Sequence, residues 1–282
     1  MKKLLLVFLA LPMIGFGQNV NIPDVNFKAY LVGNTAINTN GDTEIQVSEA
    51  AAFTGAINCS WMSISNLTGI EAFTALTWLE CSYNQLTSLN VSQNTALTEL
   101  YCRGNDLTSL NVSQNTALTQ LRCMYNQLTS LNVSGATALT SLLCWDNQLE
   151  CLDISNNINL EELHCNDNLL EQLNTRNGNW QNMYVEALNN NLSCVEVDNL
   201  GYATANWVSD FDSFVSFSTN CNYTNPCITV TAIKEQTTNK EQTTNKELLK
   251  VTDLLGRETK ATNQLLFYIY NDGTVEKKVV LE

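Results

Sequence analysis

The only histidine of this 282-residue chain, His164, lies directly before Cys165. A histidine beside a cysteine could act as a base next to a nucleophile. Both residues fall in a segment of alternating apolar residues, which predicts a β-strand whose neighbouring side chains point to opposite faces. His164 and Cys165 therefore cannot meet. The sequence has no phosphate-binding loop, zinc-ligand spacing or convincing carboxylate pair, and we predict that the protein is not an enzyme.

Six of the ten cysteines form a row that recurs at an almost constant interval along the chain. They are Cys59, Cys81, Cys102, Cys123, Cys144 and Cys165. Such a row is either a metal or redox array or a column of buried thiols. Cysteine is among the most often buried residues, and parallel side chains on adjacent strands do not have disulfide geometry. We therefore predict that these six thiols are buried and unpaired.

The other four cysteines lie outside this row. Cys151 stands where earlier repeats have serine, and the sequence assigns it no partner. Cys194, Cys221 and Cys227 lie at or after the end of the repeats. We favour a disulfide between Cys194 and Cys221 that fastens a terminal cap, with a bond between Cys221 and Cys227 as the alternative.

Segment 38–49 has oxygen-bearing side chains at the spacing of a calcium loop. The candidate ligands at positions 1, 3, 5, 7 and 12 are Asn38, Asn40, Asp42, Glu44 and Glu49. The segment resembles an EF-hand loop, but position 1 is Asn rather than Asp, and Thr43 replaces the glycine of the sharp turn. The alternatives are weak calcium binding and a loop that only shapes the amino-terminal cap. No other cofactor is predicted.

The chain aligns with itself without a gap from one repeat to the next, as in LTWLECSYNQLTSLNVSQNTA (76–96) and LTELYCRGNDLTSLNVSQNTA (97–117). The pattern L-x-x-L-x-C-x-x-N-x-L-x-x-L resembles the leucine-rich repeat over residues 57–197. This resemblance implies an α/β solenoid of 21-residue coils, with a parallel β-sheet on its concave face. Each coil must bury its apolar residues against its neighbours, and segment 22–32 is expected to form a capping helix with Pro23 in its first turn.

An asparagine follows each expected strand of the solenoid. These residues are Asn84, Asn105, Asn126, Asn147, Asn168 and Asn190. An inward amide can satisfy turn backbone groups of its own coil and of the adjacent coil. We predict a structural column of buried amides with no ligand role.

Fixing the inward strand positions also fixes the outward ones, which are rich in aromatic residues. The candidates for partner binding are Trp78, Tyr101, Arg103, Arg122, Met124, Tyr125, Trp145 and His164. Aromatic residues, Arg and Met are typical of protein interfaces, and solenoids bind partners on their concave sheets. The alternative is that these aromatics only fit a strand.

Net charge divides the chain into three parts. Residues 19–233 contain 4 basic and 20 acidic residues, and residues 234–282 contain 8 of each. A repeat region of charge −16 argues against nucleic-acid binding, because phosphates would repel it. Arg103 and Arg122 are two of the four cations in that region.

The chain ends suggest export. Residues 1–17 combine Lys2 and Lys3 with an apolar run, which predicts a cleaved signal peptide. After the repeats we expect a cap at 198–227 and a linker at 228–246, because the duplicated KEQTTN segment is polar and lacks apolar residues. The mature chain would begin with a cap at 18–56, and a small β module would occupy 247–282.

The tail resembles the carboxy-terminal sorting domain (type A) of the type IX secretion system. The matching positions are Asp253, Gly256, Arg257, Asp272, Gly273, Lys277 and Lys278. The resemblance implies that the type IX translocon recognises the tail. We therefore expect a secreted or cell-surface leucine-rich-repeat protein for protein recognition or adhesion, with glycan binding as the alternative.

Overall fold

The computed structural model describes residues 18–223, 248–252, 264–270 and 275–280. The chain divides into two compact units, Met1–Thr231 and Ala232–Glu282, and each is described by itself. The predicted signal peptide, the linker and sorting positions Asp253, Gly256, Arg257, Asp272 and Gly273 lie outside the described residues.

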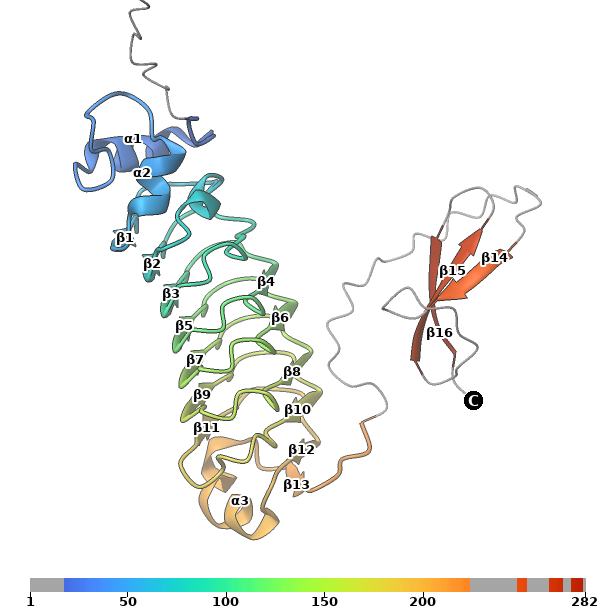
Figure 1. Ribbon diagram of the computed structural model, residues 1–282. Helices are drawn as coiled ribbons and strands as arrows, with labels where there is room; N and C mark the ends of the chain where they lie inside the picture. The colour runs from blue at the N-terminus through green and yellow to red at the C-terminus, as the bar shows by residue number, and fades with distance from the viewer. Residues whose placement is uncertain (1–17, 224–247, 253–263, 271–274, 281–282) are drawn as a thin grey trace, which may run out of the picture. The chain divides into compact units, whose positions relative to one another are not determined.

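The first unit is a solenoid of stacked coils, as the repeat predicts (Figure 1). One side of the stack is a seven-stranded parallel sheet in which each strand comes from a different coil. In order across the sheet the strands are β1 (Ala56–Asn58), β2 (Trp78–Glu80), β3 (Glu99–Tyr101), β5 (Gln120–Arg122), β7 (Ser141–Leu143), β9 (Glu162–His164) and β11 (Tyr184–Glu186). The middle residue of each is buried, which confirms the predicted alternation.

The other side of the stack is a second row of short strands, which the sequence reasoning did not anticipate. It contains β4 (Ser109–Asn111) paired with β6 (Ser130–Asn132). A four-stranded sheet continues with β8 (Cys151–Asp153), β10 (Gln172–Asn174), β12 (Cys194–Glu196) and β13 (Ser216–Ser218). A short polar–apolar–polar segment can form a strand of this row, because only its central residue points into the core.

The two rows of strands enclose one hydrophobic core. In the coil that begins at Leu97 the inward residues are Leu97, Leu100, Cys102, Leu107, Leu110 and Val112, all at most 3% exposed. All six cysteines of the regular row are free and 0% exposed. We call them the cysteine column. Its thiols lie in the core as small apolar groups, as predicted.

Asn126 shows how the asparagine column joins the coils. Its Nδ2 donates to the carbonyl oxygens of Cys102 (3.0 Å) and Cys123 (3.0 Å), and its Oδ1 accepts from the Leu107 N–H (3.1 Å). A second buried column, Asn94, Asn115 and Asn157, makes similar inter-coil bonds and was not predicted from sequence. Ala136 interrupts this second column at the corresponding position.

Two short helices close the amino-terminal end of the core. Helix α1 (Val25–Gly33) buries Phe27 and Leu31, and α2 (Val47–Ala52) buries Ala50. The Asp24 carboxylate caps α1 by accepting from the N–H groups of residues 26 and 27. Pro23 therefore precedes the helix cap instead of lying in the first turn. A 3₁₀ turn, η1 (Ile70–Ala72), follows β1 in the same coil.

The other end of the stack is closed by α3 (Leu200–Asn206), η2 (Val208–Asp210) and β13. Trp207, Phe211 and Phe217 pack here edge to face. A disulfide joins Cys194 to Cys221, which is the pairing favoured from sequence. Cys151 is also disulfide-bonded, although no partner for it was evident from the sequence.

The second unit contains a three-stranded antiparallel sheet in the order β14 (Leu248–Thr252), β15 (Gln264–Tyr270) and β16 (Val275–Val280). Lys277 and Lys278 of the predicted sorting motif lie in β16, paired with β15. The three strands fall within segment 247–282, where a small β module was expected.

Candidate functional site

The outward face of the seven-stranded sheet, with the turn that follows each strand, is the candidate site, and we call it the strand face. Equivalent residues of successive coils form columns across it. One column runs through Tyr101, Arg122, Leu143 and His164, which are register partners on β3, β5, β7 and β9. The next outward column contains Arg103, Met124 and Trp145. All eight residues predicted for partner binding belong to this face or its edge.

Both arginines of the strand face lie over tyrosine rings. The guanidinium carbon of Arg103 is 4.7 Å from the ring centroid of Tyr83, and that of Arg122 is 4.5 Å from the centroid of Tyr101. Trp78 packs edge-on against Tyr101, with centroids 5.9 Å apart. These contacts hold two flexible cationic side chains flat on the sheet.

The Tyr101 hydroxyl is also held in place. It donates to the Glu99 carboxylate and lies 2.8 Å from the side-chain oxygen of Gln120. Burial and the Glu99 carboxylate raise the pKa of Tyr101, and the nearby Arg122 guanidinium opposes that shift. Tyr101 is therefore a fixed, neutral platform for the Arg122 cation.

The turn after each strand of this sheet has left-handed backbone geometry at one equivalent position; Ser63 has it as well. The residues at the equivalent position are Trp61, Tyr83, Gly104, Tyr125, Asp146, Asp167 and Asn189, with φ between 54° and 65°. Glycine, asparagine and aspartate suit this geometry, whereas a bulky side chain costs on the order of 1–2 kcal/mol. Three coils nevertheless place an aromatic residue there.

The aromatic side chains at these turn positions are stacked and accessible to solvent. Trp61 is 73% exposed and stacks on Tyr83 with centroids 4.0 Å apart. A Cβ on Gly104 would lie 2.6 Å from the Tyr83 ring, so the missing side chain makes room for that ring. Trp61 was not among the predicted residues, although it precedes Tyr83 by the same interval as Cys59 precedes Cys81.

Tyr125 and Trp145 form a second aromatic pair, edge to face at 4.4 Å. Tyr125 is 44% exposed. Met124 lies between the Arg103 and Trp145 positions and was predicted to contact a partner. Its side chain is only 5% exposed. Its neighbours cover it, so it supports the face without offering surface to a partner.

His164 lies between two carboxylates. Its Nδ1 is 2.7 Å from Oε2 of Glu186, and its Nε2 is 3.2 Å from Oε1 of Glu162. Ser141 Oγ donates to the other oxygen of Glu162 at 2.6 Å. Neither glutamate is among the residues predicted for partner binding. Their places in the repeat could have identified them, because Glu162 lies two positions before His164 and Glu186 is the register partner of His164.

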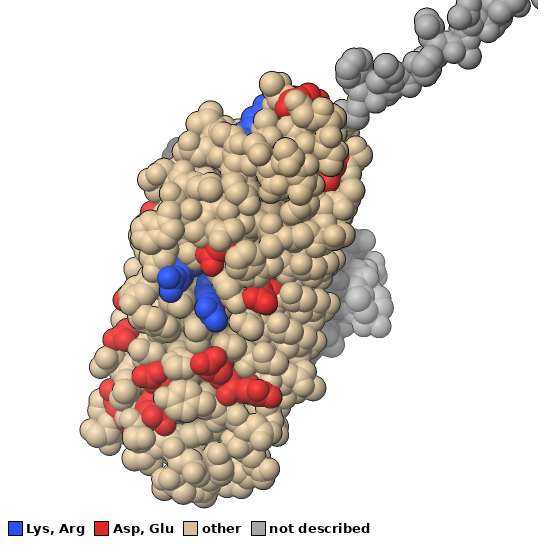
Figure 2. All heavy atoms as spheres, turned by 90° about the vertical axis from the view of Figure 1, so that its left-hand side faces the viewer, with Lys and Arg blue, Asp and Glu red and all other residues tan. Residues whose placement is uncertain are grey.

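Charge is unevenly distributed over the strand face. Figure 2, which looks onto it, shows basic atoms in the middle of the solenoid with some acidic atoms beside them, and more acidic atoms gathered toward the end formed by the later coils. The acidic residues of those coils include Asp146, Glu161, Glu162, Asp167 and Glu186. The face therefore has both of its arginines at the centre, near Glu80 and Glu99, and an anionic end.

The five predicted calcium ligands share one loop, whose polar groups bond to one another. Asn38 Oδ1 accepts from Gly41 N, Asp42 Oδ1 from Glu44 N, and Glu49 Oε1 from the N–H groups of Thr39 and Asn40. The bond from the Glu44 N–H lowers the pKa of Asp42. Glu44 itself pairs with Lys28 at 2.6 Å. This network supports the alternative of a loop that shapes the cap, and calcium binding stays a prediction.

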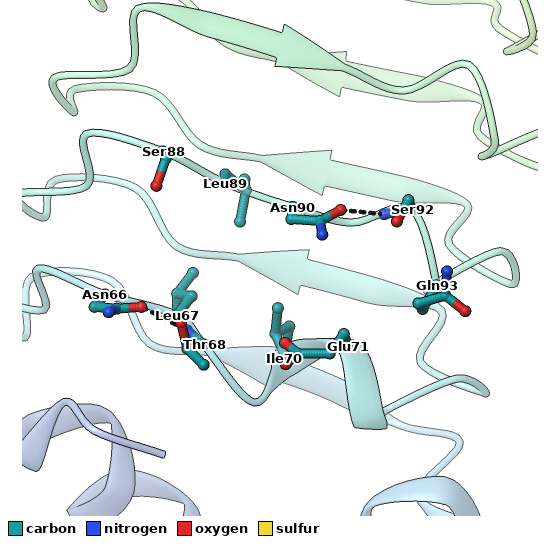
Figure 3. A pocket seen from close by; sticks show the side chains of 10 residues that line it. All are labelled: Asn66, Leu67, Thr68, Ile70, Glu71, Ser88, Leu89, Asn90, Ser92 and Gln93. Carbon is teal, nitrogen blue, oxygen red and sulfur yellow. Dashed lines mark hydrogen bonds between the residues drawn. The ribbon is translucent and has the colours of Figure 1, made fainter. Parts of the chain in front are cut away.

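A hollow of about 240 Å³ lies between segments 66–71 and 88–93, beside the second row of strands (Figure 3). Its polar groups stabilise local turns: the side-chain oxygen of Asn66 accepts from Thr68 N and that of Asn90 from Ser92 N. Glu71 accepts from Gly69 N. We therefore assign no ligand to this hollow.

The structure separates His164 from Cys165, as the alternation predicts. The histidine lies on the strand face, whereas the cysteine is 0% exposed in the core. Burial raises the pKa of the Cys165 thiol well above its ordinary value. Among the described residues no three His, Cys, Asp or Glu side chains form a possible metal site, and no helix is long and apolar enough to cross a membrane.

The chain is similar to internalins of Listeria monocytogenes. Internalin J is 42% identical over 72 residues, which are 26% of this chain and 8% of that protein. The functional domain of InlJ, whose structure is described as including a cysteine ladder, is 29% identical with a TM-score of 0.39, over 64% of this chain and 52% of that one. Internalin C2 is 20% identical with a TM-score of 0.44, over 71% and 98%. No family model matches the chain.

Proposed function

We propose that this protein is an exported, secreted or cell-surface protein whose strand face recognises another protein. The observation that carries the proposal is the presence of exposed aromatic residues at left-handed backbone positions. Later coils have Asp146, Asp167 and Asn189 in the same column, so the repeat does not require aromatic residues there. Backbone strain of this kind concentrates at functional sites.

Two further features support protein recognition. Arg103 and Arg122 lie over the half-buried Tyr83 and Tyr101 rings, and Trp, Tyr and Arg are the residue types that dominate binding energy at interfaces. The aromatic pairs are held by packing before any partner arrives, which reduces the entropy lost on binding. A solenoid sheet also offers a long, rigid surface to a partner.

Alanine at Arg103, Arg122 and Trp145 together is expected to reduce partner capture by about tenfold or more, because large residues at an interface centre contribute most of the affinity. The measurement is photocrosslinking of the full chain in the producing cells, with the crosslinker at Tyr125. A crosslinker at Thr108, which directly precedes β4 of the second row of strands, is the placement control.

The matched control variant is Arg176→Ala. Arg176 is exposed and follows β10 of the second row, and its guanidinium donates to the Thr219 carbonyl (3.3 Å). It should leave capture unchanged. Equal losses in the triple variant and in Arg176→Ala, or equal capture from Thr108, would count against the strand face.

Glycan binding is the second candidate, favoured by the open Trp61 ring, which could stack on a sugar. A glycan array probed with the full chain separates the two. An array signal that Trp61→Ala and Trp145→Ala abolish, with no crosslinked protein, would replace protein recognition by glycan recognition.

We also propose that the tail directs export through the type IX system after a signal peptide at residues 1–17. Deleting 247–282 is expected to abolish arrival at the medium and cell surface and to leave the solenoid in the periplasm. The measurement is fractionation and immunoblotting, with Arg176→Ala in the full chain as a control for export. A truncated chain that still reached the medium would refute this route.

A further inference from the structure

Arg103 and Arg122 have no acidic partner within the described chain. The ion pairs there are Lys28 with Glu44 and His164 with its two glutamates, and no described carboxylate forms an ion pair with either arginine. Carboxylates are plentiful in a region of charge −16. Nε of Arg122 is buried and has no hydrogen-bond partner. A partly desolvated guanidinium that has no carboxylate partner of its own can bind a carboxylate of another molecule.

The strand face has two charged regions, which we call poles: Arg103 and Arg122 form the first, and Glu162 and Glu186, on either side of His164, form the second. The second pole is anionic whether or not His164 carries a proton. A single imidazole carries at most one positive charge, and it lies between the carboxylates of Glu162 and Glu186. Exposed Glu161 and Asp167 lie in the same coil as Glu162. This end therefore attracts a cation and repels a carboxylate.

The register gives the distance between the two poles. Arg122 pairs with Leu143, and Leu143 pairs with His164, so the backbone positions of Arg122 and His164 are two strand spacings apart, about 10 Å. Leu143 lies between them and Trp145 lies beside it. Both are partly exposed. The middle of the face is thus apolar, with Arg103 and Arg122 on one side, where Glu80 and Glu99 also lie on β2 and β3, and only carboxylates and His164 on the other.

We propose that the strand face binds a protein segment that carries a carboxylate and a cationic side chain two strand spacings apart, with an apolar side chain between them. This inference rests on the proposed function and specifies its partner. The carboxylate lies against Arg103 and Arg122, the apolar side chain packs on Leu143 and Trp145, and the cation faces Glu162 and Glu186. An α-helix offers this arrangement at residues i, i+3 or i+4, and i+7, which span about 10.5 Å on one face.

A displayed library of random peptides, selected on the immobilised full chain at low salt, tests the proposal. We expect peptides with opposite charges on either side of an apolar residue to exceed like-charged peptides roughly tenfold. For Arg103→Glu/Arg122→Glu we expect selection to change to peptides with cations at both ends, because both poles are then acidic. Arg176→Glu makes the same kind of charge change away from the face and should select as the wild type does.

The outcomes separate this inference from the proposed function. Enriched peptides that lose binding to Trp61→Ala/Trp145→Ala but show no opposite-charge preference would overturn the charge pattern and leave protein recognition standing. Enriched peptides that bind Trp61→Ala/Trp145→Ala as well as the wild type would overturn both. A library that yields no peptide dependent on Arg103 and Arg122 would overturn the charge pattern. Circular dichroism of every variant confirms the solenoid.

Discussion

Raising the pH from 8 to 10 should lower the free energy of unfolding by on the order of 8 kcal/mol, because six buried thiols resist ionisation only in the folded state. Burial raises the pKa of Cys59, Cys102 and Cys144 from 9.0 to about 12 and raises the pKa of the other three thiols well above 9.0. Above pH 9 the unfolded thiols lose protons while the folded ones keep them. Stability therefore falls by up to about 1.4 kcal/mol per pH unit for each thiol.

Urea unfolding followed by circular dichroism at several pH values measures this slope. Cys123→Ala removes one thiol and should reduce the slope above pH 9 by about 1.4 kcal/mol per pH unit, apart from its own effect at pH 7. A chain whose stability at pH 10 equals that at pH 8 would show that the column is accessible or ionised when folded. A domain of ordinary stability, about 5–15 kcal/mol, would come close to unfolding at pH 10.

Asn105→Ala combined with Asn126→Ala should destabilise the solenoid by about 1–3 kcal/mol more than the sum of the two single changes. Both amides donate to the carbonyl oxygen of Cys102, at 3.1 Å and 3.0 Å. Either single variant leaves this buried oxygen one donor, whereas the double variant leaves it none. A double-mutant cycle from urea unfolding at pH 7 measures the coupling.

Asn105→Ala combined with Asn147→Ala is the matched control. Asn147 donates to the carbonyls of Cys123 and Cys144 and shares no acceptor with Asn105. Its two effects should add within about 0.5 kcal/mol. Unfolding of the coupled pair under conditions where the control pair stays folded also supports the prediction, and equal coupling in both pairs contradicts it.

The strand face shows how far sequence reasoning reached within the site. Alternation placed Arg122, Trp145 and His164 on one face, because adjacent strand residues must point to opposite sides. It could not show that Met124 is covered, because this depends on how the neighbouring side chains lie over it. It also could not pair His164 with Glu186, which belongs to the next strand of the sheet, since that contact requires the register of two coils.

The sequence by itself determined the repeat length, the buried cysteine column and the first asparagine column, because the same local pattern recurs in every coil and only stacking can bury it. Only the tertiary structure decided the second row of strands, the second asparagine column and the left-handed geometry of Trp61, Tyr83 and Tyr125. The physical reason is that these features depend on inter-coil hydrogen bonds and on turn geometry. Residue type does not encode either one when an aromatic residue occupies a position that favours glycine or asparagine.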